Sequence, residues 1–212
     1  MKTSETNRFS RTLQASQRKI DNHPKSRAAK IELRYAVIAA IGRHNAAVFD
    51  AFAGAGGMYR AVWRKAKSYV GCDTRWFQDE RLAYVADNRR VLRAIDLAPF
   101  NIFDLDAYGS PWDAAAIIAH RRTLAPGERL GLMLTEGSGL NLKLSGMPGA
   151  LAMMAGIDGP VAGAFRNQGE LIDMAINGFC RRIKARVAKR WQAEGHTGAS
   201  VRYIGLLLEG VE

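Results

Sequence analysis

The chain has few cysteines and no long apolar run. Only Cys72 and Cys180 occur among its 212 residues, at a spacing that fits no common metal motif. The four histidines are equally scattered and form no ligand set. We therefore expect buried, reduced thiols, a reducing compartment and no metal. The polar, basic N-terminus has no apolar core, and no apolar run approaches the roughly 18 residues of a membrane span, so we expect a soluble, cytoplasmic protein.

Acidic residues are also scarce relative to basic ones. The chain has 31 Lys and Arg against 20 Asp and Glu, a net charge of +11. Residues 1–30 contain eight basic and two acidic residues, and residues 181–190 contain six basic residues and no acid. Concentrated positive charge is typical of a polyanion partner, although a solvated helix face and a basic tail would also explain it. The predicted nucleic-acid contacts are Arg182, Arg186, Lys189 and Arg190.

The length and the 48% hydrophobic content are enough for one core. Residues 1–24 lack periodicity and are interpreted as a flexible basic arm, with a single domain over 25–212. Residues 137–169 are rich in glycine, small residues and methionine. We interpret them as an insertion or lid on the substrate side.

Apolar runs alternate with helical patterns along the domain. The predicted strands are 48–50, 68–73, 81–86, 99–108, 129–135 and 200–209. The predicted helices are 25–43, 58–67, 74–80, 110–123 (with Ser110 as cap and Pro111 in the first position) and 170–191. This alternation predicts an α/β fold, a mostly parallel sheet of about six strands with helices on both faces.

The most informative stretch is VFDAFAGAGGMY, residues 48–59. An apolar run ends in Asp50, and three glycines (Gly54, Gly56 and Gly57) then free the backbone for a turn beneath a ligand, at the start of the next helix. A pyrophosphate loop would have a further glycine or a Lys-Ser/Thr pair where Met58 and Tyr59 stand, so phosphate binding is disfavoured. From the glycines alone, a dehydrogenase-like turn is the alternative.

VFDAFAGAGG resembles the first motif of class I S-adenosylmethionine (SAM) methyltransferases, which have a Rossmann-like fold. The resemblance implies that the loop and Asp50 hold the amino-acid end of SAM. Asp73, at the end of the second predicted strand, is placed to accept hydrogen bonds from two ribose hydroxyls, or else only caps a turn. Asp87 occupies the position that contacts the adenine amino group in that family, with Asp96 as a rival; Asn88 could instead cap a helix. The predicted cofactor residues are Asp50, Phe52, Gly54, Gly56, Asp73, Thr74, Asp87 and Asn88.

A second motif is IFDLDAYGSPW, residues 102–112. It resembles the fourth motif of amino-group methyltransferases, and most of all the Asp-Leu-Asp-Pro-Phe/Tyr-Gly-Ser-Pro run of the tRNA guanine-N2 dimethyltransferases. This chain has Ala107 where that family has proline. The resemblance covers roughly residues 46–135, and we expect no counterpart of the larger second domain of that tRNA family.

Methyl transfer from a sulfonium is an in-line displacement that mainly requires donor and acceptor to be held in line. Asp106 can accept hydrogen bonds from an exocyclic amine and favour its developing positive charge. Tyr108 can stack on a base, and Asp104 should share a face with Asp106 as a second acceptor. The structural alternative is a capping acid and a core aromatic at a strand end.

These residues predict a SAM-dependent N-methyltransferase acting on an exocyclic amine of a nucleic-acid base. RNA, with tRNA modification foremost, is expected ahead of DNA methylation. The alternatives are a non-catalytic nucleic-acid-binding module with the same fold, and a small-molecule or protein methyltransferase. We expect Asp50, Asp73 and Asp106 to gather around one crevice.

Overall fold

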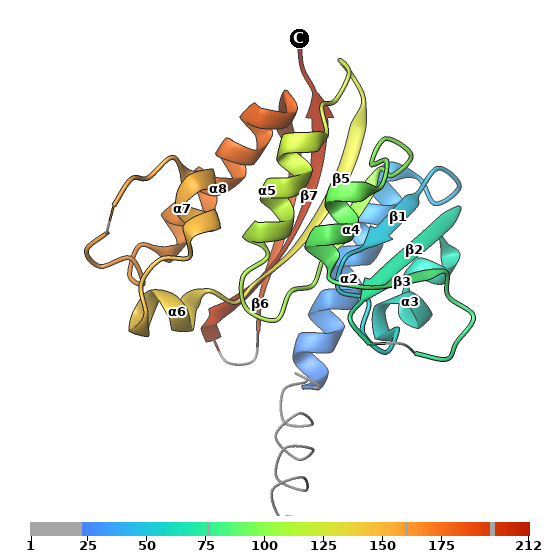
Figure 1. The fold of residues 1–212 in the computed structure, drawn as a ribbon, viewed down its shortest axis with the longest axis horizontal. Helices are drawn as coiled ribbons and strands as arrows, with labels where there is room; N and C mark the ends of the chain where they lie inside the picture. Colours follow the sequence, from blue (N-terminus) through green and yellow to red (C-terminus); the bar gives the residue numbers. More distant parts are fainter. Residues whose placement is uncertain (1–22, 76, 160, 196–197) are drawn as a thin grey trace, which may run out of the picture.

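The computed structural model describes residues 23–212 except 76, 160 and 196–197, so nearly all of the predicted N-terminal arm lies outside the described residues. Its centre is a seven-stranded sheet in the order β3-β2-β1-β4-β5-β7-β6 (Figure 1). The strands are β1 Ala47–Asp50, β2 Ser68–Asp73, β3 Ala83–Val85, β4 Ile102–Leu105, β5 Arg129–Glu136, β6 Ala185–Gly195 and β7 Gly198–Gly210. The pairs among β1 to β5 are parallel, whereas β7 runs antiparallel to both β5 and β6.

Helices cover both faces of this sheet, which confirms the predicted fold class. One face carries α2 Pro24–Ile41, α3 Gly57–Ala61 and the 3₁₀ turn η1 Trp63–Lys65. The other carries α4 Asn88–Ala94, α5 Trp112–Arg121, α6 Gly139–Leu144, α7 Gly149–Ala155 and α8 Gln168–Ile183. No helix in the described part of the chain is both long and apolar enough to span a bilayer.

The period of two along each strand explains why there are two cores. Val48 and Ile102 pack under α2, whereas their neighbours Phe49 and Phe103 pack under α4 and α5. Apart from Asp50 and Asp104, the side chains on both faces of β1 and β4 are apolar, as expected for parallel strands covered on both sides. The carboxyl ends of β1, β2, β4 and β5 meet at one end of the sheet, and that end carries the candidate site.

The helix predicted over 170–191 is wrong beyond Ile183. Lys184 adopts a left-handed conformation (φ 55°) that ends α8, and the chain then continues as the edge strand β6. Val187 and Trp191 continue the four-residue spacing of α8, but a bulge between Val187 and Lys189 of β6 places them on opposite faces of the sheet. Val187 packs against the core on the α8 side and Trp191 against the core on the α2 side. A helix over 170–191 would place Arg182, Arg186, Lys189 and Arg190 on one face. That shared face does not exist, because Arg182 lies on α8 and the other three lie on β6.

Other helix boundaries also differ from the predicted ones. The described residues of 74–82 form a loop in place of the predicted short helix, and the predicted helix 58–67 divides at Val62 into α3 and η1. Helix α5 begins one residue later than predicted, with Pro111 as its N-cap residue. The sheet has one strand more than predicted. This additional strand is β6, most of which lies within the predicted helix 170–191.

The segment 137–169 contributes to the core. Leu151 and Met154 of α7 are fully buried, and α7 packs against α5 and α8. A Cβ on Gly178 of α8 would lie 1.7 Å from the Met154 carbonyl oxygen, so only glycine permits this approach. The assignment of 137–169 as a lid stays a prediction.

Candidate functional site

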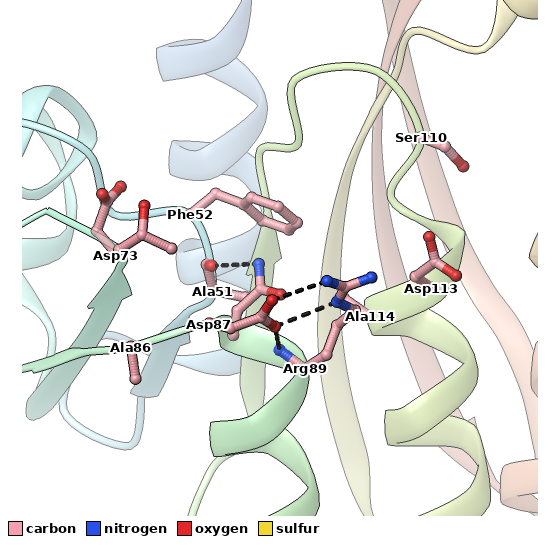
Figure 2. A pocket seen from close by; sticks show the side chains of 11 residues that line it. Ala51, Phe52, Asp73, Ala86, Asp87, Arg89, Ser110, Asp113 and Ala114 are labelled. Carbon is pink, nitrogen blue, oxygen red and sulfur yellow. Dashed lines mark hydrogen bonds and ion pairs between the residues drawn. The ribbon is translucent and has the colours of Figure 1, made fainter.

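A pocket of about 310 Å³ opens at the carboxyl ends of β1 and β2 and beyond β3 (Figure 2). Its volume is within the range of small-molecule sites, about 300–1,000 Å³. Five of the eight predicted cofactor residues line it: Phe52, Asp73, Thr74, Asp87 and Asn88. Arg89, Ser110 and Asp113 complete the polar part of the wall.

Asp73 ends β2 and connects it to the glycine turn. Its Oδ2 accepts a hydrogen bond from the Gly54 N–H at 2.9 Å, and its Oδ1 accepts one from the Arg75 N–H at 2.9 Å. The carboxylate thus caps a turn and also faces the pocket. Each oxygen retains accepting capacity, because a carboxylate offers about four lone-pair sites.

Asp87 and Asn88 fix the opposite wall. Asp87 is the N-cap residue of α4, where it accepts a hydrogen bond from the Arg89 N–H at 2.8 Å and pairs with its guanidinium at 2.8 Å. The hydrogen bonds from Arg89 lower the pKa of Asp87 to about 2. Asn88 donates to the Ala51 carbonyl at 2.9 Å, which joins α4 to the end of β1 (Figure 2).

The glycine turn is covered by an arginine that the sequence analysis missed. Gly54 and Gly56 have φ values of 46° and 76°, a region that favours glycine. Arg81, from the loop after β2, donates to the carbonyls of Ala53 and Gly54 at 3.1 and 2.9 Å. A Cβ on Gly56 would lie 2.8 Å from the Arg81 Cζ. Gly56 therefore makes room for Arg81, and no periodic pattern in the loop pointed to this contact.

Asp50 lies beneath the turn, away from the pocket. Its carboxylate is buried and accepts hydrogen bonds from the Phe52 N–H at 3.2 Å and the Tyr69 hydroxyl at 3.0 Å. Burial, with the nearby charge of Asp104, raises the pKa of Asp50 to about 8. These contacts hold the start of the turn.

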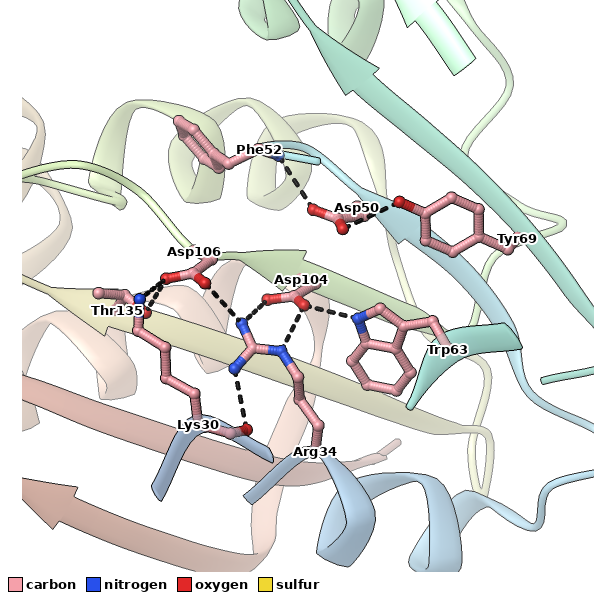
Figure 3. Close-up of polar contacts among 9 residues, drawn as sticks. All are labelled: Lys30, Arg34, Asp50, Phe52, Trp63, Tyr69, Asp104, Asp106 and Thr135. Atoms are coloured by element: carbon pink, nitrogen blue, oxygen red, sulfur yellow. Dashed lines mark hydrogen bonds and ion pairs between the residues drawn. The ribbon is translucent and has the colours of Figure 1, made fainter. Parts of the chain in front are cut away.

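Two carboxylates of the fourth motif face α2 (Figure 3). Asp104 has no exposed surface and forms a bidentate pair with Arg34, at 2.6 and 2.7 Å. The Trp63 indole N–H donates to it at 2.7 Å. Burial raises the pKa of Asp104, against the lowering effect of Arg34.

Asp106 is held by the same helix but reaches solvent, with a side chain 16% exposed. Its Oδ1 lies 2.7 Å from the Lys30 Nζ and accepts from the Thr135 hydroxyl at 2.6 Å, and its Oδ2 lies 3.3 Å from Arg34 (Figure 3). Burial acts to raise its pKa, but the charges of Arg34 and Lys30 bring that pKa below the usual value. Asp104 and Asp106 share a face, as predicted. Two basic residues four positions apart, and therefore on one face of the predicted helix, were the available signal for Lys30 and Arg34.

The three carboxylates that were expected around one crevice do not share it. Asp50, Asp73 and Asp106 all lie at the carboxyl end of the sheet, but of these Asp73 alone lines the pocket. Asp106 lies on the α2 side, where it pairs with Lys30 and Arg34, whereas Asp50 is buried against the neutral donors of Phe52 and Tyr69. The loops 50–52 and 106–110 connect them to the pocket through Phe52 and Ser110.

Tyr108 lies in the loop between β4 and α5, next to Gly109, whose φ is 101°. Its side chain is 74% exposed, which excludes the core-aromatic alternative.

The predicted nucleic-acid residues are spread over α8 and β6, and several already have partners. Arg186 pairs with Glu209, and Arg190 pairs with Asp173 at 2.6 Å. Arg182 donates to the carbonyls of Gly178 and Met153. The Lys189 Nζ lies 5.1 Å from the centroid of the Trp191 ring.

Strand register places Arg186 far from Asp106. Arg186 pairs with Glu209, which pairs with Arg129 at the start of β5, whereas Thr135 and Asp106 are at the other end. The distance along β5 from Arg129 to Thr135 is nearly the length of the strand, roughly 20 Å at about 3.3 Å per residue.

Among the residues that the structure describes, no three His, Cys, Asp or Glu side chains gather as a metal-ligand set. A comparison with protein-family models and curated protein sequences finds no match.

Solved structures are similar to this chain in fold. NodS, an N-methyltransferase from Bradyrhizobium japonicum solved with S-adenosyl-L-homocysteine, is 14% identical, with a TM-score of 0.53 over 91% of this chain and 90% of NodS. Trm1 from Pyrococcus horikoshii, solved with SAM, is 14% identical, with a TM-score of 0.57 over 87% of this chain and 56% of Trm1. A tRNA m1G37 methyltransferase from M. jannaschii is 12% identical, with a TM-score of 0.51 over 92% of this chain and 52% of the other. The chain therefore has the Rossmann-like fold of the class I SAM-dependent methyltransferases.

Proposed function

We propose that the protein is a SAM-dependent methyltransferase that acts on an exocyclic amine of a nucleic-acid base, with RNA ahead of DNA. The observation that carries this proposal is the position of the pocket. It lies at the carboxyl ends of β1 and β2, lined by Asp73 and Asp87, and the Asp106-Ala107-Tyr108 segment follows β4 at the same end of the sheet. Ligands of open α/β sheets bind at this end.

The pocket residues fit the adenosine part of SAM. Asp73 would accept hydrogen bonds from the ribose hydroxyls, and Asp87 with Asn88 would face the adenine. The turn from Asp50 to Gly56 would hold the amino-acid end, with the Arg81 guanidinium close by. Neighbours with SAM or S-adenosylhomocysteine bound, such as Trm1 and NodS, support this cofactor. Bound SAM supplies the electrophilic methyl group.

Asp106 is the acceptor for the substrate amine. Its lowered pKa keeps it ionised at neutral pH, and its Oδ2 has only a long contact with Arg34, so this oxygen can accept the hydrogens of an amine. An ionised carboxylate at this position would stabilise positive charge as it develops on the nitrogen. Tyr108 would stack on the base, worth about 1–3 kcal/mol at comparable sites.

Asp104 has a different role from the one predicted. Both of its oxygens are occupied by Arg34 and it has no exposed surface, so a substrate amine does not reach it. We assign it as a positioning residue, because it orients Arg34 toward Asp106.

Transfer to a small molecule is the second candidate. It is favoured by the pairing of Arg186 and Arg190 with acids, which reduces the charge available to a polyanion. One neighbour, a 1,6-didemethyltoxoflavin-N1-methyltransferase from Burkholderia thailandensis solved with its small-molecule substrate, is 15% identical, with a TM-score of 0.50 over 100% of this chain and 93% of that one.

The test is incubation of the protein with labelled SAM and separate pools of tRNA, rRNA and DNA, followed by mass spectrometry of the nucleosides. The proposal expects a methylated exocyclic amine in an RNA pool, formed far more slowly with Asp106→Asn. SAM binding without label in any nucleic acid would favour the small-molecule candidate. Absence of SAM binding by calorimetry would favour a non-catalytic module.

A further inference from the structure

Hydrogen-bond donors without acceptors gather where β5, β7 and α8 meet. Four buried side-chain polar atoms in the described part of the chain make no hydrogen bond of standard geometry, and three of them belong to Ser138, Gln168 and Arg202. These are a hydroxyl, an amide nitrogen and the Nε of a guanidinium. The Ser138 hydroxyl lies beside the Glu136 carboxylate and acts on its pKa as a side-chain hydrogen-bond donor, so that carboxylate serves as its acceptor. Buried polar groups normally have partners, so the atoms of Gln168 and Arg202, on neighbouring elements, indicate an external one.

The N-terminus of α8 adds to this set. Asn167 is its N-cap residue but makes no side-chain cap, which leaves N–H groups of the first turn open. Gln168, in the first turn, is 2% exposed, and its Nε2 has no acceptor. A Cβ on Gly169 would lie 2.9 Å from an Arg202 guanidinium nitrogen, so Arg202 lies directly on this turn. A helix N-terminus beside a guanidinium favours an anion.

Arg202 acts on one nearby carboxylate, Glu136, whose pKa burial raises and the positive charge of Arg202 lowers, but the two side chains form no ion pair. No described carboxylate pairs with Arg202 within 4.0 Å. Glu136, its register partner on β5, is buried and accepts hydrogen bonds from the Trp112 indole and the Ser138 N–H. Glu170 lies in the first turn of α8 but is exposed. Lys143 of α6 contacts Phe165, whose carbonyl accepts from the Gln168 N–H.

The corner adjoins the proposed catalytic loop. The Gly137 N–H donates to the Gly109 carbonyl at 2.7 Å, which joins the loop before Ser138 to the loop that carries Tyr108. Thr135, one residue before Glu136, donates to Asp106. Arg202 is on β7, two strands from β4 in the sheet, a separation of roughly 10 Å at about 4.8 Å per strand.

We propose that Gln168, Arg202 and the N-terminus of α8 bind a backbone phosphate of the nucleic acid next to the target base. This inference rests on the proposed function, since it assigns the phosphate contact of the same site. It differs from the surface predicted around Arg186, which lies at the opposite end of the same two-stranded ribbon.

The experiment measures binding of an oligouridylate to the full chain at several salt concentrations. Uridine has no exocyclic amine, so binding does not depend on methyl transfer. Arg202→Gln should weaken binding and reduce the slope of log K against log salt by about 1, because one phosphate contact is lost. Gln168→Met should weaken binding with a smaller change in slope. Arg202→Lys should keep most of the slope.

Arg43→Gln, at the end of α2, is the matched control, and Arg186→Gln tests the rival surface. An unchanged slope in Arg202→Gln, or an equal loss in Arg186→Gln, would overturn the inference. Inorganic phosphate at matched ionic strength should compete with the oligonucleotide in the wild type, and saturable competition that persists in Arg202→Gln would also overturn it. SAM affinity reports correct folding of each variant. Loss of slope in Arg202→Gln without methylation of any nucleic acid would support the phosphate site while the proposed function fails.

Discussion

Four aspartates at or just beyond strand ends differ mainly in their surroundings. Asp73 meets backbone N–H groups and the pocket, whereas Asp104 meets a guanidinium and an indole in the core. Asp50 has neutral donors and a raised pKa, and Asp106 has two cations and a lowered one. The same side chain thus provides a turn anchor, a buried ion-pair partner or, as proposed for Asp106, an acceptor for a substrate amine, according to which donors reach it.

Asp73→Asn should weaken SAM binding by about 10- to 100-fold. Hydrogen bonds to a charged group contribute about 1.5–3 kcal/mol, and the amide offers one acceptor oxygen where the carboxylate has two. Calorimetric titration with SAM measures the effect, with the exposed Asp158→Asn as the control. Equal affinities for wild type and Asp73→Asn would remove Asp73 from the ribose site.

Asp106→Asn should lower the rate of methyl transfer by about 100-fold or more, since one preorganised charge contact at the reacting nitrogen is lost. SAM affinity should change little, because Asp106 does not line the pocket. Single-turnover transfer and SAM titration on the same preparation separate the two effects. Full activity in this variant would refute the catalytic assignment.

Asp50 should make stability depend on pH. Between 3.8, the ordinary pKa, and about 8, the folded protein retains a proton on Asp50 that the unfolded chain has released. Raising the pH through this window therefore lowers the free energy of unfolding, by up to about 1.4 kcal/mol per pH unit. Asp50→Asn should show a shallower decline in urea unfolding from pH 4 to 8. The same substitution at an exposed aspartate, Asp158→Asn, is the control and should leave the decline unchanged.

At the scale of elements, the buried guanidinium of Arg34 links α2 to β4 through an ion pair. Arg34 comes from an 18-residue helix and forms a bidentate pair with Asp104, while Lys30, one turn earlier, meets Asp106. These ion pairs connect α2, which precedes the glycine turn, to the fourth motif roughly 70 residues later.

Arg34→Met should therefore destabilise the fold by about 3–5 kcal/mol, because it leaves Asp104 buried and unpaired. The double variant Arg34→Met/Asp104→Asn removes the uncompensated charge and should recover part of that loss. Urea unfolding of wild type, both single variants and the double variant completes the cycle. Additive losses would mean that the two side chains are not coupled.

Elements also show where local patterns misled. Ile183, Val187 and Trp191 repeat at four-residue spacing, yet only the first lies in α8. β6 forms because β7 offers it a full row of hydrogen bonds, and β7 lies more than ten residues away along much of the pairing. A short window of sequence does not contain that partner.

For the whole molecule, SAM should raise the melting temperature. A ligand at 100 times its Kd stabilises the folded state by about 2.7 kcal/mol, which is about 5–11 °C for a domain of this size. Thermal scans with and without SAM measure the shift. Asp73→Asn should show a smaller shift at the same SAM concentration, and no shift in the wild type would oppose the cofactor assignment.

The sequence by itself determined the α/β class, the glycine turn, β2 to its exact ends, and the placement of Asp73 and Asp106 at the carboxyl end of the sheet. These features depend on short-range chemistry: an apolar run, a carboxylate after it, and glycines where φ is positive. The tertiary structure alone decided that Arg34 and Lys30 hold the fourth motif, that Arg81 covers the turn, and that β6 is a strand. Each of these depends on residues distant in sequence that meet only when the sheet assembles, because burial decides which charges must be paired and which backbone finds a neighbour.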